Sequence, residues 1–269
     1  MAGALFDPVL SWWQLLLIAL GLVLVGEVGH LLGRRHPSEH LDEKKSHAGI
    51  SVGALLGLLG LMLAFSFGIV ESRFHERKKL VLEEANAIGT AYLRADMIPP
   101  PHRERTRDLL KLYVDVRLLW TDSDDLERAI ERSSALQNAL WSEATAASVA
   151  NPQSLPVSNF VVTLNPMFDL RESRITVALH QRLPPTILLM LYTTAVLSIG
   201  VFGYSTGLSR TRSLMPTAAV VLAITAVVAL IVDLDNPGSR LFAISQSALR
   251  DVQESMRSAP RPAVVSPSG

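Results

Sequence analysis

The sequence of 269 residues contains no cysteine. Disulfide bonds, thiolate nucleophiles and cysteine metal sites are therefore all excluded. An excess of charge of one sign is also missing, because 25 Lys and Arg balance 25 Asp and Glu. Nothing in the composition favours nucleic acid or another polyanion as a partner. Strand-like alternation of apolar and polar residues is absent over any useful length, which favours an all-α protein.

The motifs of common enzymes are missing too. There is no H-E-x-x-H, no phosphate-binding glycine loop and no G-x-S-x-G. His36, His40 and His47 crowd one polar stretch together with acidic residues, but they form no closed four-ligand spacing. A solvated loop explains these residues better than a metal site does. We therefore expect no enzyme, no bound metal and no cofactor.

Long apolar runs are what the sequence has in abundance. Hydrophobic residues make up 49% and charged residues 19% of the chain, with a mean hydropathy of +0.29. A helix crosses a hydrocarbon core of about 30 Å with roughly 20 residues. Four runs are long enough, and they predict an all-α membrane protein with four transmembrane helices in two hairpins: residues 12–32, 49–70, 185–208 and 214–233.

The second run continues beyond the expected membrane boundary without a proline. After Val70 the sequence turns polar, yet apolar residues recur at spacings of seven, four, three, four and three. This pattern is typical of a packing seam on one helix that extends to Ala95. The seam consists of Phe74, Val81, Ala85, Ile88, Tyr92 and Ala95.

The region 71–183 is predicted to form a helical extramembrane domain. After the long helix, Pro99 to Pro101 interrupt the pattern, and three further helices are expected over about 102–120, 122–151 and 156–182. One domain is expected over 10–257. The tail 258–269, rich in Ser and Pro, is expected to be disordered.

Several sequence blocks resemble the bacterial bestrophin-like domain family, over nearly the whole chain. They are the end of the second run, Leu63 to Phe67, the block around 74–94, the helix around 109–117 and the turn 233–237. The block 74–94 contains Phe74, Arg77, Glu83, Glu84, Ala85, Asn86, Ile88, Gly89, Thr90, Tyr92, Leu93 and Arg94. The resemblance implies four spans, a helical extramembrane domain and a ring-like assembly. One departure is Asn236, where relatives commonly carry a basic residue.

The second span carries two candidate surfaces. Gly49, Gly53, Gly57, Gly60, Ala64 and Gly68 form a stripe of small residues, which predicts close packing on a neighbouring helix. Beside it run Leu61, Phe65 and Ile69, followed by Arg73 and Arg77. In a ring of subunits this row would form an apolar neck that gates by dewetting, with an arginine collar for anions. The alternative is that the apolar residues face lipid or the protein core.

Three further groups of polar residues stand out. Glu27 and His30 form an ionisable pair within the first span, either functional or held near the membrane surface. The turn after the fourth span contains Asp233, Asp235 and Pro237. A structural ion-pair network is expected, with a regulatory ligand site as the alternative, from Glu83, Glu84, Asn86, Arg94, Arg107 and Arg117.

Two functions follow from these observations. The first is a homo-oligomeric channel in the plasma (inner) membrane, pentameric and anion-selective by resemblance to the bestrophins. The second is a non-conducting scaffold or sensor whose helical domain binds a partner or signal. Positive charge near the span ends is nearly balanced between the two sides, so only the resemblance favours a cytoplasmic helical domain.

Overall fold

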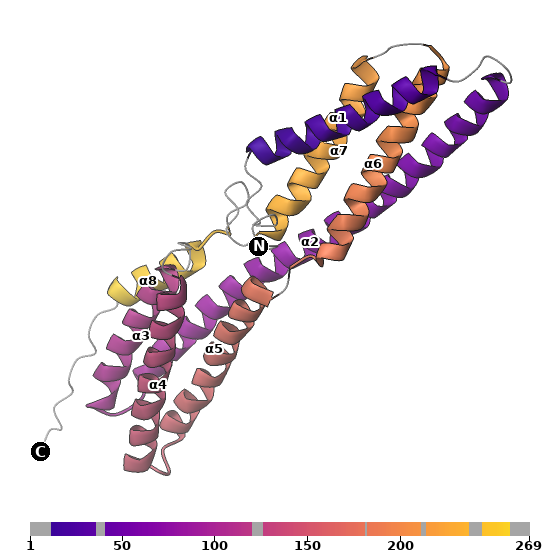
Figure 1. Cartoon of the computed structure of the whole chain (residues 1–269). Helices are drawn as coiled ribbons and strands as arrows, with labels where there is room; N and C mark the ends of the chain where they lie inside the picture. The colour runs from indigo at the N-terminus through magenta and orange to yellow at the C-terminus, as the bar shows by residue number, and fades with distance from the viewer. Residues whose placement is uncertain are drawn as a thin grey trace, which may run out of the picture. The chain divides into compact units, whose positions relative to one another are not determined.

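The structure is a computed structural model, and it describes residues 12–35, 41–119, 126–180, 182–210, 214–236 and 244–258. Within these ranges every regular element is a helix, which confirms the predicted all-α class (Figure 1). The helices are α1 (Trp12–Arg34), α2 (Leu41–Ala95), α3 (His102–Leu118), α4 (Leu126–Ala150), α5 (Leu155–His180), α6 (Pro185–Leu208), α7 (Leu214–Asp235) and α8 (Ser247–Ser258).

Four helices are long and apolar enough to cross a membrane, as predicted: α1, α2, α6 and α7. α6 begins at Pro185, where proline suits the first helical position because the N–H that it lacks would have no partner in the helix. α2 is one uninterrupted helix of 55 residues. It begins at Leu41 rather than near Gly49, so the last part of the expected loop is helical.

The bounds of α6 agree with the predicted 185–208, and the other described boundaries lie within a few residues of the prediction, except at the C-terminal end. There α8 forms a helix that the pattern had not indicated. The expected helix 122–151 corresponds to α4, and its predicted start at Asp122 lies outside the described residues, as does the tail 259–269.

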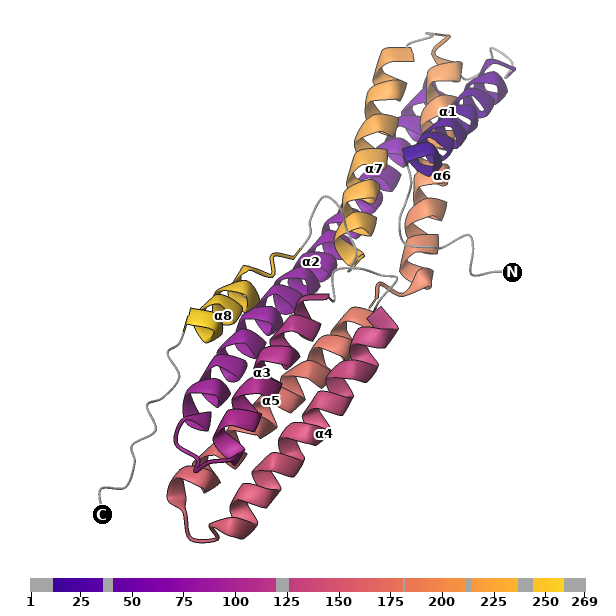
Figure 2. The ribbon, with the colours of Figure 1, turned by 90° about the vertical axis from the view of Figure 1, so that its left-hand side faces the viewer.

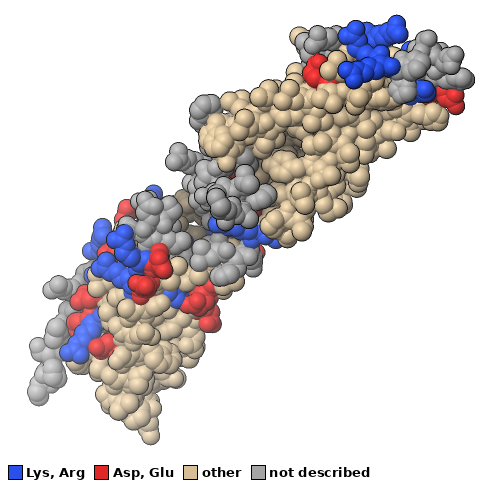
Figure 3. Space-filling model, in the orientation of Figure 1, with Lys and Arg blue, Asp and Glu red and all other residues tan. Residues whose placement is uncertain are grey.

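The chain divides into two compact units. The apolar unit consists of residues 1–74 and 182–242, and the amphipathic unit of residues 75–181 and 243–269. On the side of the apolar unit visible in Figure 3, uncharged residues cover the helices, while Lys and Arg gather at one end.

The closest packing within the apolar unit is between α1 and α6, which run in the same direction (Figure 2). A Cβ atom on Gly203 would lie 2.0 Å from the backbone oxygen of Gly26. On Gly207 it would lie 2.3 Å from the oxygen of His30. Only hydrogen fits at these positions, so glycine is required there. Both helices use the same spacing of three and then four residues, at 26, 29 and 33 and at 200, 203 and 207.

The amphipathic unit buries the predicted seam. Val81, Ala85, Ile88, Tyr92 and Ala95 are all at most 4% exposed in its core. Phe74, the first residue of the seam, is instead half-buried against the core of the apolar unit. Apolar residues on the other helices of the amphipathic unit complete its core, among them Leu110, Tyr113, Leu140, Phe160, Leu164 and Met167.

α8 packs on this core through one apolar side. Leu249 and Met256, seven residues apart, are buried, and Val252 between them packs against the same cluster. The hydroxyl of Tyr92 donates to the backbone oxygen of Met256 at 3.1 Å. The side-chain amide of Gln253 donates to Asp115 on α3 at 2.5 Å. α8 is thus a fixed part of the amphipathic unit.

The glycine contact predicts a sharp difference between two Gly→Ala substitutions. Gly203→Ala should lower the stability of the detergent-solubilised protein, by about 3 kcal/mol if the cost is at the upper end of overpacking. Gly21→Ala on α1 is the control, because a Cβ added there would meet no atom within 4 Å. Thermal unfolding followed by near-UV circular dichroism compares the two. Equal unfolding temperatures would contradict the proposed fit between α1 and α6.

Candidate functional site

The part of α2 in the apolar unit has one buried side. Leu59, Leu63, Ser66 and Val70, at spacings of four, three and four, are at most 9% exposed. The opposite side is left uncovered by the described residues. Membrane helices expose one side either to lipid or to another helix, so the residue types on this side decide its use.

The predicted neck residues lie on the uncovered side. Leu61, Phe65 and Ile69 are 53%, 66% and 39% exposed. They do not pack in the core of this chain, which removes one of the two alternatives for them. Facing lipid and facing the axis of a ring both agree with this exposure.

The glycines of α2 lie on the same uncovered side. At Gly49, Gly53, Gly57, Gly60 and Gly68 an added Cβ would meet no atom within 4 Å. The described residues of this chain therefore do not supply the close helix contact that the small-residue stripe predicts. Among the described residues, the close glycine contact lies between α1 and α6. It was not predicted from the sequence, although the repeated spacing could have indicated it.

The predicted arginine collar is largely covered. Arg73 is 23% exposed, and its Nη1 lies 3.6 Å from Oδ1 of Asp235. The backbone N–H of Leu183 donates to both carboxylate oxygens of Asp235 at 3.0 Å. Asp235 therefore links α2, the entry to α6 and the end of α7. Arg77 is buried, at 7% exposure, in the amphipathic unit.

The rest of the turn after α7 is only partly described. The backbone N–H of Asn236 donates to the backbone oxygen of Asp233 at 3.2 Å, and Asn236 is buried. Pro237 lies outside the described residues. Of the three predicted turn residues, Asp235 thus lies at a charged contact, with Arg73 of α2.

Glu27 and His30 are the ionisable pair predicted in the first span, and His30 lies at the contact between α1 and α6. His30 is buried, and its Nδ1 lies 3.2 Å from Oγ1 of Thr206 on α6. The hydroxyl of Thr206 donates to the backbone oxygen of Gly203 at 2.7 Å. Its oxygen is therefore the acceptor for His30, which places a proton on Nδ1. Glu27 is half-buried one turn earlier.

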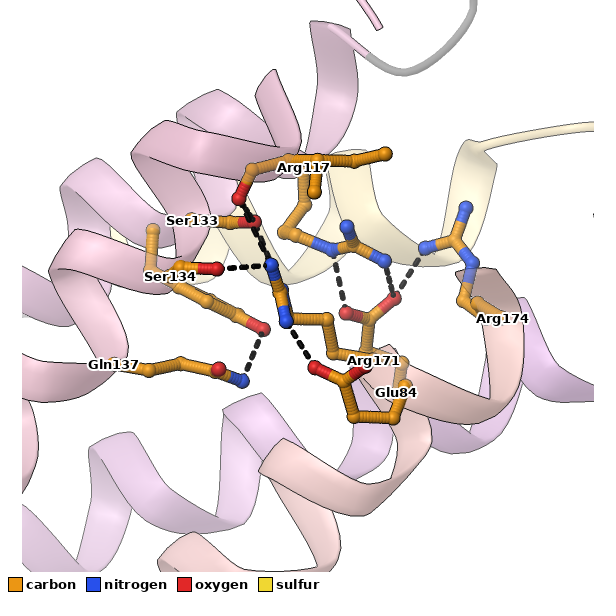
Figure 4. A network of polar contacts seen from close by, with 10 residues as sticks. Glu84, Arg117, Ser133, Ser134, Gln137, Arg171 and Arg174 are labelled. Carbon is orange, nitrogen blue, oxygen red and sulfur yellow. Dashed lines mark hydrogen bonds and ion pairs between the residues drawn. The ribbon is translucent and has the colours of Figure 1, made fainter. Parts of the chain in front are cut away.

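The centre of the amphipathic unit is a buried ion-pair cluster around Glu84. Arg117 of α3 donates from Nε and Nη2 to the two carboxylate oxygens at 2.6 and 3.1 Å. Arg174 of α5 forms a further ion pair with the same carboxylate. Figure 4 shows both guanidinium groups directed at Glu84. The cluster therefore joins three helices through a carboxylate that is 0% exposed.

The charges of this cluster settle its ionisation. Burial raises the pKa of Glu84, but the charges of Arg117 and Arg174 outweigh burial and leave that pKa below the ordinary 4.5. Burial lowers the pKa of Arg174, and the negative charge of Glu84 offsets this lowering only in part. The lowered pKa of Glu84 favours its charged form, whereas the lowered pKa of Arg174 opposes its charged form. An arginine pKa nevertheless starts so far above neutrality that Arg174 stays charged.

A second layer of polar contacts surrounds the cluster. Arg171 donates from Nε to Oγ of Ser133 at 2.9 Å and from Nη2 to the backbone oxygen of Ile130 at 2.8 Å (Figure 4). Burial, reinforced by the charge of Glu84, raises the pKa of Tyr113. Tyr113 therefore remains a neutral hydroxyl beside the cluster.

The other members of the predicted network lie elsewhere. Glu83 pairs with Lys79 at 3.6 Å on the surface. Arg107 pairs with Asp96 and donates to the hydroxyl of Tyr92 at 2.5 Å. Arg94 contacts α5, and Asn86 is exposed. Only Glu84 and Arg117 of the six meet, while Arg174 and Arg171 were not singled out from the sequence.

No metal centre emerges from the described residues, in which no three His, Asp or Glu side chains come together. His47 is exposed and lies 3.9 Å from Glu43 one turn earlier. His36 and His40, the other two histidines of that loop, lie outside the described residues.

Comparison with known families gives one match over most of the chain. A model of the bestrophin-like domain matches residues 20–249. The chain belongs to the bestrophin-like domain family. This membership confirms the resemblance noted from the sequence and, together with the four apolar helices, indicates a multi-pass membrane protein in contact with lipid. Neither curated proteins nor solved structures gave a match.

Loss of the Glu84 charge should destabilise the amphipathic unit. Glu84→Gln leaves two buried guanidinium groups without their carboxylate, and breaking a buried pair costs about 3–5 kcal/mol. Glu83→Gln is the matched control, since its carboxylate is on the surface and its ion pair is worth about 1 kcal/mol at most. Thermal unfolding measures both variants. A Glu84→Gln protein as stable as Glu83→Gln would show that the cluster contributes little.

The same cluster predicts an acid dependence of stability. Because the pKa of Glu84 is lower in the folded than in the unfolded chain, its contribution is complete above about pH 4.5 and is lost as pH falls below that value. Wild type should therefore lose stability more steeply than Glu84→Gln in this acid range. Unfolding temperatures between pH 6 and pH 3.5 measure the two slopes, and parallel slopes would contradict the assignment.

Proposed function

We propose that this bestrophin-like protein is the subunit of a homo-oligomeric ion channel, with α2 of each subunit facing a central axis. The observation that carries this proposal is the uncovered glycine side of α2. At five glycines there, an added Cβ would meet no described atom within 4 Å, although small residues in membrane helices serve close helix contacts. A second copy of the chain supplies the missing partner.

The composition of the other exposed surfaces supports this use of α2. The sides that α1, α6 and α7 expose carry bulky apolar residues, as lipid-facing helices do: Trp13, Leu16, Leu17, Leu20, Leu24, Leu189, Leu197, Met215 and Leu222. α2 is the helix whose open side in the apolar unit is rich in glycine. Lipid contact gives no reason for that difference, whereas subunit contact does.

In such a ring Leu61, Phe65 and Ile69 would line the narrowest part of the passage. Rings of apolar side chains close a narrow pore by excluding water. Arg73 lies one turn beyond Ile69 and would favour anions at the mouth, although its pairing with Asp235 reduces its free charge. Anion selectivity and a pentameric state rest on the resemblance to the bestrophins.

The same proposal places the amphipathic unit outside the membrane. Its surface carries many charged residues, and its core is closed by its own helices. Two hairpins, α1 with α2 and α6 with α7, would then cross the plasma (inner) membrane, with the amphipathic unit in the cytoplasm. A protease site inserted between α3 and α4 tests this orientation.

A scaffold or sensor is the second candidate, because a groove on the amphipathic unit could receive a ligand. Both functions allow self-association, but only a channel conducts. The two predictions that follow test assembly and conduction separately.

Assembly should depend on the glycines of α2. Gly57→Leu combined with Gly60→Leu should shift the solubilised oligomer toward the monomer, since bulky residues prevent close approach of a partner helix. The fold of the single chain should survive, because both positions border open space. Light scattering of the detergent complex gives the mass. Gly21→Leu, which also borders open space on α1, should keep the wild-type mass.

Conduction should depend on Phe65. Phe65→Ala should widen and wet the neck and increase ion flux into liposomes, while assembly persists. Leu20→Ala, at a position on α1 that is 55% exposed against 66% for Phe65, should leave flux unchanged. If flux through all three proteins is the same, α2 presents Phe65 to lipid and the scaffold function is favoured.

A further inference from the structure

The polar residues between positions 83 and 94 lie on two different sides of α2, one facing the core and one facing outward. Glu84 points into the core, where its ion pairs account for it. Glu83, Asn86, Thr90 and Arg94 instead line a groove of about 600 Å³ between α2 and α5. A volume of this size is in the range of small-molecule sites, about 300–1,000 Å³. Unlike Glu84, these outer residues are not enclosed in the core, and their contacts lie at the groove.

Arg94 forms the cationic end of this groove. Its Nη1 donates to Oγ1 of Thr163 at 2.6 Å and to the backbone oxygen of Asn159 at 3.0 Å. The Thr163 hydroxyl donates to the same backbone oxygen at 2.8 Å, so its oxygen is free to accept from Arg94. The guanidinium is thus held by one nitrogen in a defined orientation.

The remaining donors of Arg94 are available to a ligand. Among the described residues no carboxylate lies within ion-pair distance of Arg94, and its Nε and Nη2 make no hydrogen bond to them. A guanidinium has five N–H donors in a planar fork that matches a carboxylate. Arg94 is therefore a preoriented guanidinium with donors that a carboxylate can use.

The other end of the groove is acidic. Asp169 follows Thr163 by six residues on α5, which places it roughly 9 Å further along the helix axis. Its side chain is exposed, and no described cation pairs with it. Glu83, also at this end, is partly neutralised by Lys79 at 3.6 Å. The groove thus has opposite charges at its two ends.

On the α5 side, the wall between the two ends is apolar and contains a proline, while Asn86 and Thr90 line the α2 side. Val162, Pro166 and Leu170 line it on α5. Pro166 lies within the helix and lacks the N–H that would ordinarily bond to the carbonyl of Val162. This part of the wall accommodates a hydrocarbon chain and offers one additional acceptor.

We propose that the groove between α2 and α5 binds a small zwitterion with a carboxylate at one end and an ammonium group at the other. The carboxylate is bound by Arg94, the ammonium group by Asp169, and the methylene chain lies on Pro166 and its neighbours. The site does not depend on ion conduction.

Calorimetric titration of the full-length, detergent-solubilised protein tests the site. The probe is 6-aminohexanoate, and hexanoate and hexylamine each lack one of its charges. Since a hydrogen bond to a charged group contributes enough for about a tenfold change, each single-charge analogue should bind about tenfold more weakly. Equal binding of all three compounds, or no heat from any, would overturn the proposal.

Three variants assign the two ends. Arg94→Gln should reduce affinity for 6-aminohexanoate to that of hexylamine, and Asp169→Asn should reduce it to that of hexanoate. Arg257→Gln, at an exposed arginine of the same unit that pairs with Asp115, should bind as wild type does. Wild-type affinity in Arg94→Gln would contradict the assignment of the carboxylate.

Folding of the variants is checked by circular dichroism. If Arg94→Gln is unfolded, Asp169→Asn decides, because its exposed side chain has no described ion-pair partner. Wild-type affinity in Asp169→Asn then overturns the proposal. Heat of binding is measured without ion flux, so failure of this site and failure of the channel are distinguishable.

Discussion

Burial along one side of α2 is the constraint on which the rest of the structure depends. Leu59, Leu63 and Val70 commit one side of this helix to the core of the apolar unit. Val81, Ile88 and Ala95 commit α2 likewise to the core of the amphipathic unit. α2 has 55 residues. Most of the stability of a helix in a protein comes from packing of its apolar side, so both cores stabilise this helix. The side left over is rich in glycine, and it is the side that the proposed channel uses for contact between subunits.

Much of the fold follows from local patterns and was predictable. The four spans and the seam at Val81, Ala85 and Ile88 each arise from residue spacing within one helix, and spacing is visible in a sequence. The helix starting at Pro185 follows from the chemistry of one residue. α8 was missed because its apolar side consists of three residues, Leu249, Val252 and Met256, in an otherwise polar stretch.

The contacts between distant residues could not be derived in the same way. Glu84 was recognised as an acid that needs partners, and Arg117 was among those named. Arg174, however, is 90 residues away, and only the packing of α5 on α2 brings it to Glu84. The glycines show the same limit. Identical spacing on α1 and α6 is visible in the sequence, but the pairing of these two helices depends on the fold.

The central claim is that the uncovered side of α2 faces other copies of the chain. Because the chain has no cysteine, single cysteines can be introduced and cross-linked in native membranes without background. The account predicts disulfide-linked dimers from Leu61→Cys, Phe65→Cys and Ile69→Cys, and none from Leu63→Cys on the buried side or Leu20→Cys on α1. Dimers from Leu20→Cys with none from the three α2 positions would contradict it.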